Sequence, residues 1–180
     1  MSTAAFVARS PQTAASMSRP AWFRRSHVQT TIVCGPPGSG KSTYVRKRAF
    51  SGDLVVCFDT IADEMFGRQG NVRARAGLGV DQIADVLRRR NELIAQLFRP
   101  KAADRWIMAW LTLSEPIGQH RQWWHDTLGA SVTLLTTPAH ECLRRIEADA
   151  AAGDDRGNGA KASVDMWWHS FTPAACDRAC

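Results

Sequence analysis

The chain has 180 residues, 44% of them hydrophobic and 22% charged, which is ordinary for one compact soluble domain with its own core. No stretch approaches the roughly 18 uninterrupted apolar residues of a membrane-spanning helix, so a membrane partner is excluded. The net charge of +6 is uneven, because residues 1–52 contain eight Lys and Arg and no acid, whereas the remainder has 15 basic and 17 acidic residues.

Residues 1–26 are rich in Ala, Ser, Arg and Pro and show little periodicity, which predicts a disordered basic leader before a domain of residues 27–180. The composition also resembles an organellar transit peptide, although it has no convincing amphipathic stretch. A basic leader on a nearly neutral body is weak evidence for a polyanionic partner, so nucleic acid is a possible partner and no more.

A phosphate-binding loop follows the first predicted strand, Val28–Cys34, and precedes a helix-forming stretch over residues 42–50. Glycines in such a loop let successive backbone N–H groups surround a β-phosphate at the start of the helix. The lysine of the motif reaches the β- and γ-phosphates, and the following hydroxyl holds Mg²⁺. The sequence therefore predicts MgATP binding by Gly35, Pro36, Pro37, Gly38, Ser39, Gly40, Lys41, Ser42 and Thr43.

Beyond the loop, short apolar strands alternate with helices, which predicts an α/β fold with a parallel sheet. The further strands are expected at Leu54–Phe58, Trp106–Leu111 and Val132–Thr136. The helices are expected at Ile61–Phe66, from Asp81 onward, at Ser114–Leu128 with Ser114 as its cap, from Pro138 to about Asp149, and around Val164, Trp167, Trp168 and Phe171. Arg88-Arg89-Arg90 is expected on a solvated face of the long helix.

Asp59 stands at the carboxyl end of the second strand, where ligands of such sheets collect. A carboxylate beside a bound γ-phosphate can accept the proton of an attacking hydroxyl, or help to hold Mg²⁺. Asp59 is therefore a candidate base and, with Ser42, a candidate metal ligand. The alternative role of Asp59 is N-capping of the helix Ile61–Phe66.

Cations are expected around a migrating phosphoryl group. Arg144 and Arg145 precede a Gly-rich segment, residues 150–161, whose composition is typical of a mobile lid and which contains Arg156. Arg73 and Arg75, in the loop between Gly67 and Gly79, could contact an acceptor phosphate. The alternative for both segments is a solvated loop with incidental charge.

An acid usually follows the strand beside the phosphate-loop strand, yet Trp106–Leu111 is followed by Thr112-Leu113-Ser114, with Glu115 further on. This absence argues against an ATPase motor. It leaves open a nucleotide-dependent switch or assembly accessory with weak or no ATPase activity.

Three segments, Cys34–Thr43, Val55–Asp59 and Thr137–Arg145, resemble the P-loop kinase family that includes bacteriophage polynucleotide kinase and zeta-toxin-like kinases. The chain is also similar to small P-loop proteins of phage genomes. The resemblance implies a three-layer fold with sheet order 2-3-1-4, Asp59 as general base and a lid arginine near Arg145. Two positions depart from it: Ala62 replaces an arginine that grips the acceptor phosphate, and Asp149 replaces a second lid arginine.

Together these features predict an ATP-dependent kinase acting on a hydroxyl acceptor, either a polynucleotide 5′-hydroxyl or a small molecule. Lys41, Asp59, Arg145 and Arg156 are the predicted catalytic residues. Five cysteines form no CxxC pair and no regular framework, which indicates free thiols in a reducing, cytoplasmic compartment. The acceptor and the oligomeric state are not predicted.

Overall fold

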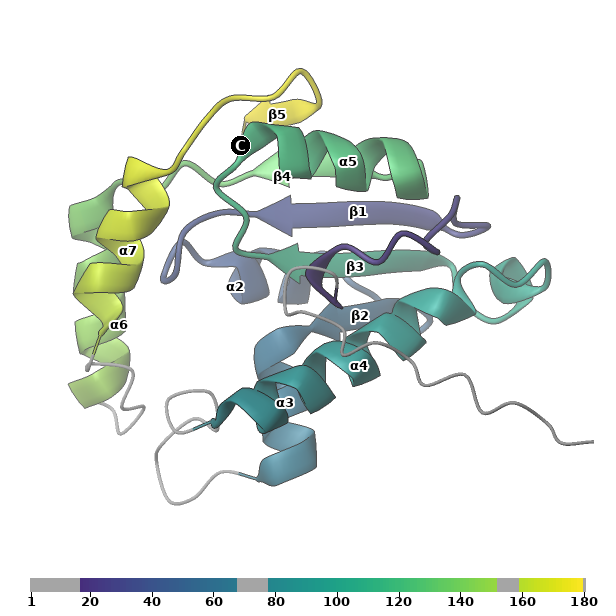
Figure 1. Cartoon of the computed structure of the whole chain (residues 1–180), viewed down its shortest axis with the longest axis horizontal. Coiled ribbons are helices and arrows are strands. Elements are labelled where there is room, and N and C mark those ends of the chain that lie inside the picture. The colour runs from purple at the N-terminus through teal and green to yellow at the C-terminus, as the bar shows by residue number, and fades with distance from the viewer. Residues whose placement is uncertain (1–16, 68–77, 152–158, 180) are drawn as a thin grey trace, which may run out of the picture.

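The protein, seen in a computed structural model that describes residues 17–67, 78–151 and 159–179, is built on a five-stranded parallel sheet (Figure 1). The strand order is β2-β3-β1-β4-β5, which confirms the predicted order of the first four strands and adds a fifth. The strands are β1 (Gln29–Cys34), β2 (Leu54–Cys57), β3 (Met108–Leu113), β4 (Ser131–Leu134) and β5 (Asp177–Ala179). The helices are α2 (Lys41–Arg46), α3 (Phe58–Phe66), α4 (Val80–Gln96), α5 (Gly118–Leu128), α6 (Ala139–Ala151) and α7 (Ala160–His169), with a 3₁₀ turn at Ala102–Asp104.

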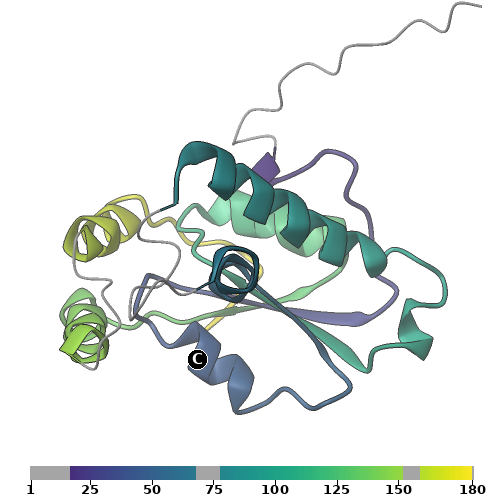
Figure 2. The same cartoon turned by 90° about the horizontal axis from the view of Figure 1, so that it is seen from below.

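The alternation of side chains along β1 separates the two faces of the sheet. Ile32 belongs to the larger core, which contains residues of α3, α4 and α5, whereas Val33 packs with Val45 of α2 on the other face. Figure 2 shows α4 and α5 together on one side of the sheet and α2 on the other. The pair α6 and α7 lies beyond the carboxyl end of β1, at the left of Figure 1. The three layers expected from the sequence are therefore present.

Two element boundaries differ from those expected in ways that affect the site. β3 ends at Leu113 and not at Leu111, because Thr112 and Leu113 pair in register with Val33 and Cys34 of β1. α5 begins at Gly118 and its cap position is Ile117, so the predicted cap at Ser114 is wrong. The predicted end of this helix at Leu128 is confirmed, and the residue that follows, Gly129, has the left-handed φ of 66° that favours glycine.

Residues 17–26, which were expected in the leader, pack against the domain in the structure; residues 1–16 lie outside the described part of the chain. Phe23 is 7% exposed, with its ring centroid 5.4 Å from that of Phe98 and 5.7 Å from that of Trp124. Arg90 is 6% exposed and donates hydrogen bonds to backbone carbonyls of this segment, so its expected place on a solvated face is wrong. Its neighbours Arg88 and Arg89 are exposed, as expected.

The C-terminal strand β5 is fixed to the domain through one buried cation on α5. Arg121 has no exposed surface, and its Nε and Nη2 donate to the two carboxylate oxygens of Asp177 at 2.8 and 2.7 Å. The same guanidinium donates to the carbonyl oxygens of Glu115, Pro116 and Thr172. This one side chain therefore joins β5 to the loop that follows β3.

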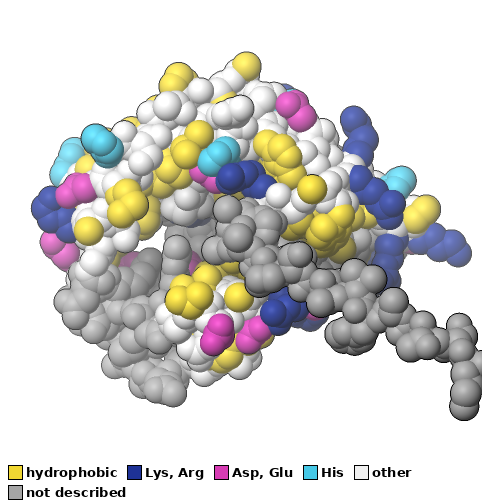
Figure 3. Space-filling model, viewed as in Figure 1, with side chains coloured by type: hydrophobic (Ala, Val, Ile, Leu, Met, Phe, Trp, Pro, Cys, Tyr) yellow, Lys and Arg dark blue, Asp and Glu magenta, His cyan; other side chains and the backbone are white. Residues whose placement is uncertain are grey.

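Lys and Arg side chains gather at the end of the molecule away from α6 and α7, where β1 begins (right-hand side of Figure 3). Ligands of parallel α/β sheets bind at the opposite end, beyond the carboxyl ends of the strands. Within the described residues, every helix is too short or too polar to cross a membrane.

Candidate functional site

The loop between β1 and α2 has a backbone conformation that favours glycine over residues with a side chain. Gly38 and Gly40 have φ of 74° and 91°, in the left-handed region. A Cβ on Gly38 would lie 2.5 Å from the carbonyl oxygen of Cys142 on α6, and a Cβ on Gly35 would lie 2.8 Å from that of Leu135. The glycines of the motif thus allow the loop to turn inward while packing tightly against the segment from β4 to α6.

Lys41 is the first residue of α2, and its ammonium group lies on the loop itself. Nζ donates to the carbonyl oxygens of Gly35 and Pro36 at 2.9 and 2.8 Å. Ser39 has a buried hydroxyl with no hydrogen-bond partner among the described residues. Because buried polar groups are nearly always paired, this unpaired Oγ, which lies close to Gly35 within the loop, suits a hydrogen bond to an oxygen atom of a polyphosphate. Ser42 and Thr43 lie exposed in the first turn of α2.

A cavity of about 220 Å³ lies at the carboxyl end of the sheet and brings Asp59 together with Lys41. Asp59 lies in the first turn of α3, and the cap position of that helix is Cys57, so the capping role considered for Asp59 is wrong. The helix begins as soon as β2 ends, which places the carboxylate at the strand tip, as expected. The cavity is lined by Ser18, Lys41, Phe58, Asp59, Arg90, Thr112, Leu113, Ser114, Glu115 and Trp124.

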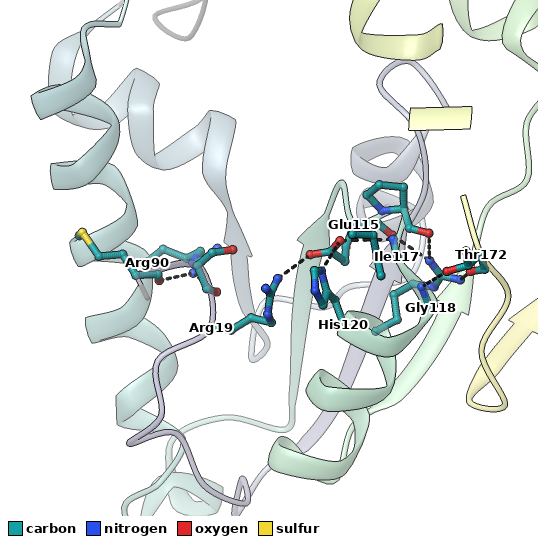
Figure 4. Close-up of polar contacts among 11 residues, drawn as sticks. Arg19, Arg90, Glu115, Ile117, Gly118, His120 and Thr172 are labelled. Carbon is teal, nitrogen blue, oxygen red and sulfur yellow. Dashed lines mark hydrogen bonds and ion pairs between the residues drawn. The ribbon is translucent and has the colours of Figure 1, made fainter. Parts of the chain in front are cut away.

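Glu115 lies closer to the sheet than the sequence predicted. Since β3 extends to Leu113, Glu115 stands only two residues past the strand and lines the same cavity as Asp59. Its carboxylate accepts a hydrogen bond from Arg19 at 3.1 Å and lies 3.1 Å from Nδ1 of His120 (Figure 4). The sequence feature that could have located Glu115 is Thr112-Leu113, because both residues continue the buried strand although Thr112 carries a hydroxyl.

Arg145 on α6 reaches the phosphate loop. Its Nη1 donates to the carbonyl oxygen of Ser39 at 3.2 Å, and its Nε donates to Glu141 at 2.7 Å. Arg144 binds the same carboxylate but is exposed. The hydrogen bond from Arg144, followed in size by that from Arg145, lowers the pKa of Glu141 to about 2. Glu141 is therefore ionised at neutral pH and holds both guanidinium groups.

Other predicted site residues lie outside the described part of the chain: Arg73, Arg75, Arg156 and most of the predicted lid, residues 150–161. The catalytic roles of Lys41, Asp59 and Arg145 remain predictions, although the structure places all three at one end of the sheet. Two buried groups near the site have shifted pKa values. Burial raises the pKa of the Cys34 thiol to about 12, which keeps it protonated, and lowers that of Arg90 to about 10, which leaves it a cation.

Two chains of solved structures share this fold at low sequence identity. One chain of a structure titled Pnkp1/Rnl/Hen1 RNA repair complex is 16% identical with a TM-score of 0.56, over 84% of this chain and 48% of that one. A second structure of the Pnkp1/Rnl/Hen1 complex is 18% identical with a TM-score of 0.50, over 67% and 40%. A gluconokinase from Sinorhizobium meliloti 1021 is 15% identical with a TM-score of 0.49, over 87% and 83%.

The chain thus spans about half or less of the two chains from the RNA repair complex. No curated protein matches the sequence. A family profile described as AAA domain matches residues 31–174, from the first strand to the segment after α7, and so covers most of the chain. With the phosphate-binding loop and the sheet order in place, this chain belongs to the AAA domain family and has its P-loop kinase-like fold.

Proposed function

We propose that this protein is a phosphotransferase that moves the γ-phosphoryl group of ATP to a hydroxyl group of an acceptor. The observation that carries the proposal is the shared cavity, in which the phosphate-loop lysine Lys41 and the strand-tip carboxylate Asp59 face the same space. Phosphoryl transfer needs a cation at the phosphates and a carboxylate at the incoming hydroxyl, and both groups stand here at the end of the sheet where ligands bind.

The residues of the loop fit a bound polyphosphate. Lys41 donates to two loop carbonyls, and on nucleotide binding its ammonium would exchange these for phosphate oxygens. Arg145 lies against the loop through the carbonyl of Ser39, close enough to add positive charge on the side of α6. Asp59 would accept the proton of the acceptor hydroxyl as it attacks the γ-phosphorus.

The cavity also fits a divalent cation that prefers oxygen ligands. Mg²⁺ bound with ATP would neutralise charge that develops on the β- and γ-phosphates. Ser42 and Asp59 are the expected ligands: Asp59 lines the cavity together with the carboxylate of Glu115, whereas Ser42 lies exposed in the first turn of α2, next to Lys41. Hydroxyl and carboxylate oxygens are the donors that Mg²⁺ selects, and it usually keeps several waters besides.

The alternative, a nucleotide-dependent switch with weak or no ATPase activity, rested mainly on a missing acid after the third strand. Glu115 weakens that reason, since it follows β3 by two residues and lines the cavity. The acceptor stays open between two classes. The fold shared with chains of an RNA repair complex keeps a polynucleotide 5′-hydroxyl as a candidate, whereas Ala62, buried and apolar, supplies no charge for an acceptor phosphate.

The test is transfer of labelled γ-phosphate from ATP to a panel of hydroxyl acceptors, with nucleotide affinity measured in parallel by calorimetry. The panel contains DNA and RNA with 5′-hydroxyl ends, nucleosides and small polyols. The proposal expects a labelled product with at least one acceptor. ATP binding without any labelled product would support the switch instead. Absence of measurable binding of both ATP and GTP would contradict both functions.

A further inference from the structure

One wall of the cavity comes from a segment that precedes the family domain. We name residues 17–23 the N-terminal strap; they lie before residue 31, where the family match begins. Ser18 lines the cavity directly, and Arg90 of α4, which holds the strap in place, lines it as well. The strap therefore forms part of the cavity wall together with α4.

The strap is attached to α4 by paired, buried polar groups. Nη2 of Arg90 donates to the carbonyl oxygens of Met17 and Ser18 at 3.1 and 2.9 Å, and Nδ2 of Asn91 donates to Met17 at 2.9 Å. Arg90 and Asn91 are each 6% exposed. Burying a guanidinium costs free energy unless its N–H donors are paired. Because Arg90 and Asn91 find these partners in the strap, they fix its position on α4.

From this attachment the strap reaches the loop after β3. Nη1 of Arg19 donates to Oε2 of Glu115 at 3.1 Å, while Oε1 of Glu115 accepts from the backbone N–H of Ile117 at 3.3 Å and lies 3.1 Å from His120 (Figure 4). A carboxylate offers about four acceptor positions, and three are taken by these partners. Glu115 is thus held in one orientation with capacity for a further hydrogen bond.

The chemistry of the lining indicates what would use that capacity. The cavity is lined by two acidic residues, Asp59 and Glu115, three hydroxyl residues, Ser18, Thr112 and Ser114, and two aromatic residues, Phe58 and Trp124. Hydroxyl groups of an acceptor can donate to the carboxylates, and its C–H faces can pack on rings. Among the described residues, two cations line the cavity, Arg90 and Lys41. Arg90 is held by backbone carbonyls of the strap, and Lys41, the lysine of the phosphate loop, is the one expected at ATP.

Size points the same way, because about 220 Å³ is below the roughly 300–1,000 Å³ of most drug-sized ligand sites. Building on the proposed phosphotransfer, we propose that the acceptor is a small, uncharged polyhydroxy molecule. The strap closes its pocket, and Arg19 and His120 orient Glu115 to accept a hydrogen bond from one of its hydroxyls. Glu115 then determines acceptor specificity, and Arg19 is a positioning residue.

The first experiment compares matched acceptors with the full chain at saturating ATP. D-glucitol and D-gluconate differ only in a terminal CH₂OH against a carboxylate, and adenosine is matched with an oligoadenylate that has a 5′-hydroxyl end. In every pair that is phosphorylated, initial rates of ADP formation should give the neutral member a kcat/KM about tenfold higher, the loss expected from one unpaired charge. A preference for gluconate or the oligonucleotide would overturn the inference and leave the kinase proposal standing.

The second experiment tests the strap with Arg19→Ala, Arg19→Lys and the control Arg24→Ala. Arg24 lies in the next few residues, exposed, with its guanidinium 5.8 Å from the ring of Phe98. We expect Arg19→Ala to raise the acceptor KM about tenfold at unchanged KM for ATP, Arg19→Lys to recover part of this, and Arg24→Ala to leave both constants unchanged. Thermal melts verify folding of each variant.

The outcomes separate the two proposals. An unchanged acceptor KM in Arg19→Ala would remove the strap from acceptor binding without affecting phosphotransfer. Failure of every acceptor to receive phosphate from bound ATP would contradict the proposed function itself. Glu115→Gln, which keeps the shape of the side chain but weakens its hydrogen bonds, should raise the acceptor KM like Arg19→Ala, and a normal KM in this variant would contradict the specificity role.

Discussion

Arg145 donates a hydrogen bond of 3.2 Å to the carbonyl oxygen of Ser39, which joins α6 to the phosphate-binding loop across 106 residues of sequence. The neighbouring Arg144 shares the carboxylate of Glu141 with Arg145 but does not reach the loop. Two adjacent guanidinium groups therefore differ in one respect that matters for catalysis. In the proposed phosphotransfer, Arg145 is the one that would face the charge developing at the γ-phosphate.

This difference predicts unequal effects of two alanine substitutions. Arg145→Ala should lower kcat for phosphoryl transfer by about 100-fold, the usual loss when one donor to a charged transition state is removed. Arg144→Ala is the matched control and should change kcat less than about threefold, because exposed ion pairs contribute little. Steady-state kinetics measures kcat for both variants and for the unmodified protein. The same kcat in Arg145→Ala as in Arg144→Ala would contradict a role of Arg145 in phosphoryl transfer.

Lys41 and Asp59 line one cavity but are expected to act at different stages. Lys41→Ala should abolish nucleotide binding as measured by calorimetry. Asp59→Asn should bind ATP with near-normal affinity and lose roughly 10²–10⁴-fold in transfer, the range for removal of a general base. Parallel loss of ATP affinity in both variants would count against Asp59 as the base.

The features predicted correctly are those that local sequence determines by itself. The phosphate loop needs glycine at Gly38 and Gly40 because both have positive φ, and apolar runs mark β1 to β4. Asp59 could be placed because it directly follows such a run. The fifth strand could not be found in this way, since Asp177–Ala179 has no apolar pattern and is held by Arg121, a residue distant in sequence.

The acceptor side of the cavity escaped prediction for a related reason. Met17 and Ser18 lie in a segment whose composition is typical of disorder, and they are fixed by Arg90, which reads as one more surface arginine in a run of three. Only the folded chain shows that this arginine is turned inward. The sequence does not predict Glu115 as a site residue, because the expected strand ends at Leu111 and the observed one continues through Thr112 to Leu113.

Ser39 provides a prediction on the nucleotide side of the site. Its Oγ is buried and has no hydrogen-bond partner among the described residues, which costs free energy in the absence of ligand. Ser39→Ala should therefore leave the Tm without nucleotide unchanged or slightly raised. The rise in Tm on adding MgATP should shrink, with ATP affinity about fivefold weaker for one lost hydrogen bond. A lower Tm without ATP, with an unchanged response to it, would show that the hydroxyl acts only within the fold.

Gly38 and Gly129 allow backbone strain to be separated from steric fit. Both have positive φ, 74° and 66°, so alanine at either position costs about 1–2 kcal/mol of unfolding free energy. At Gly38 the Cβ would also lie 2.5 Å from the carbonyl oxygen of Cys142, whereas at Gly129 it would meet the flexible side chain of Arg25 at 3.2 Å. Gly38→Ala should therefore lose ATP binding and Gly129→Ala should keep it. Retained affinity in Gly38→Ala would mean that α6 can move away from the loop.

The pair of Arg121 and Asp177 predicts how the C-terminal strand contributes to stability. Arg121 is fully buried and Asp177 is 11% exposed on its side chain, so removing one partner leaves the other charge without compensation. Arg121→Met should lower the free energy of unfolding by about 3 kcal/mol or more, as measured by urea denaturation.

In the double variant Arg121→Met/Asp177→Asn the buried charge is gone as well, and the amide oxygen of Asn can still accept a hydrogen bond from the backbone N–H of Ala174. The double variant should consequently lose less stability than the sum of the two single variants. Additive losses would show that the two side chains do not stabilise each other, and that β5 is held by its backbone pairing with β4 instead.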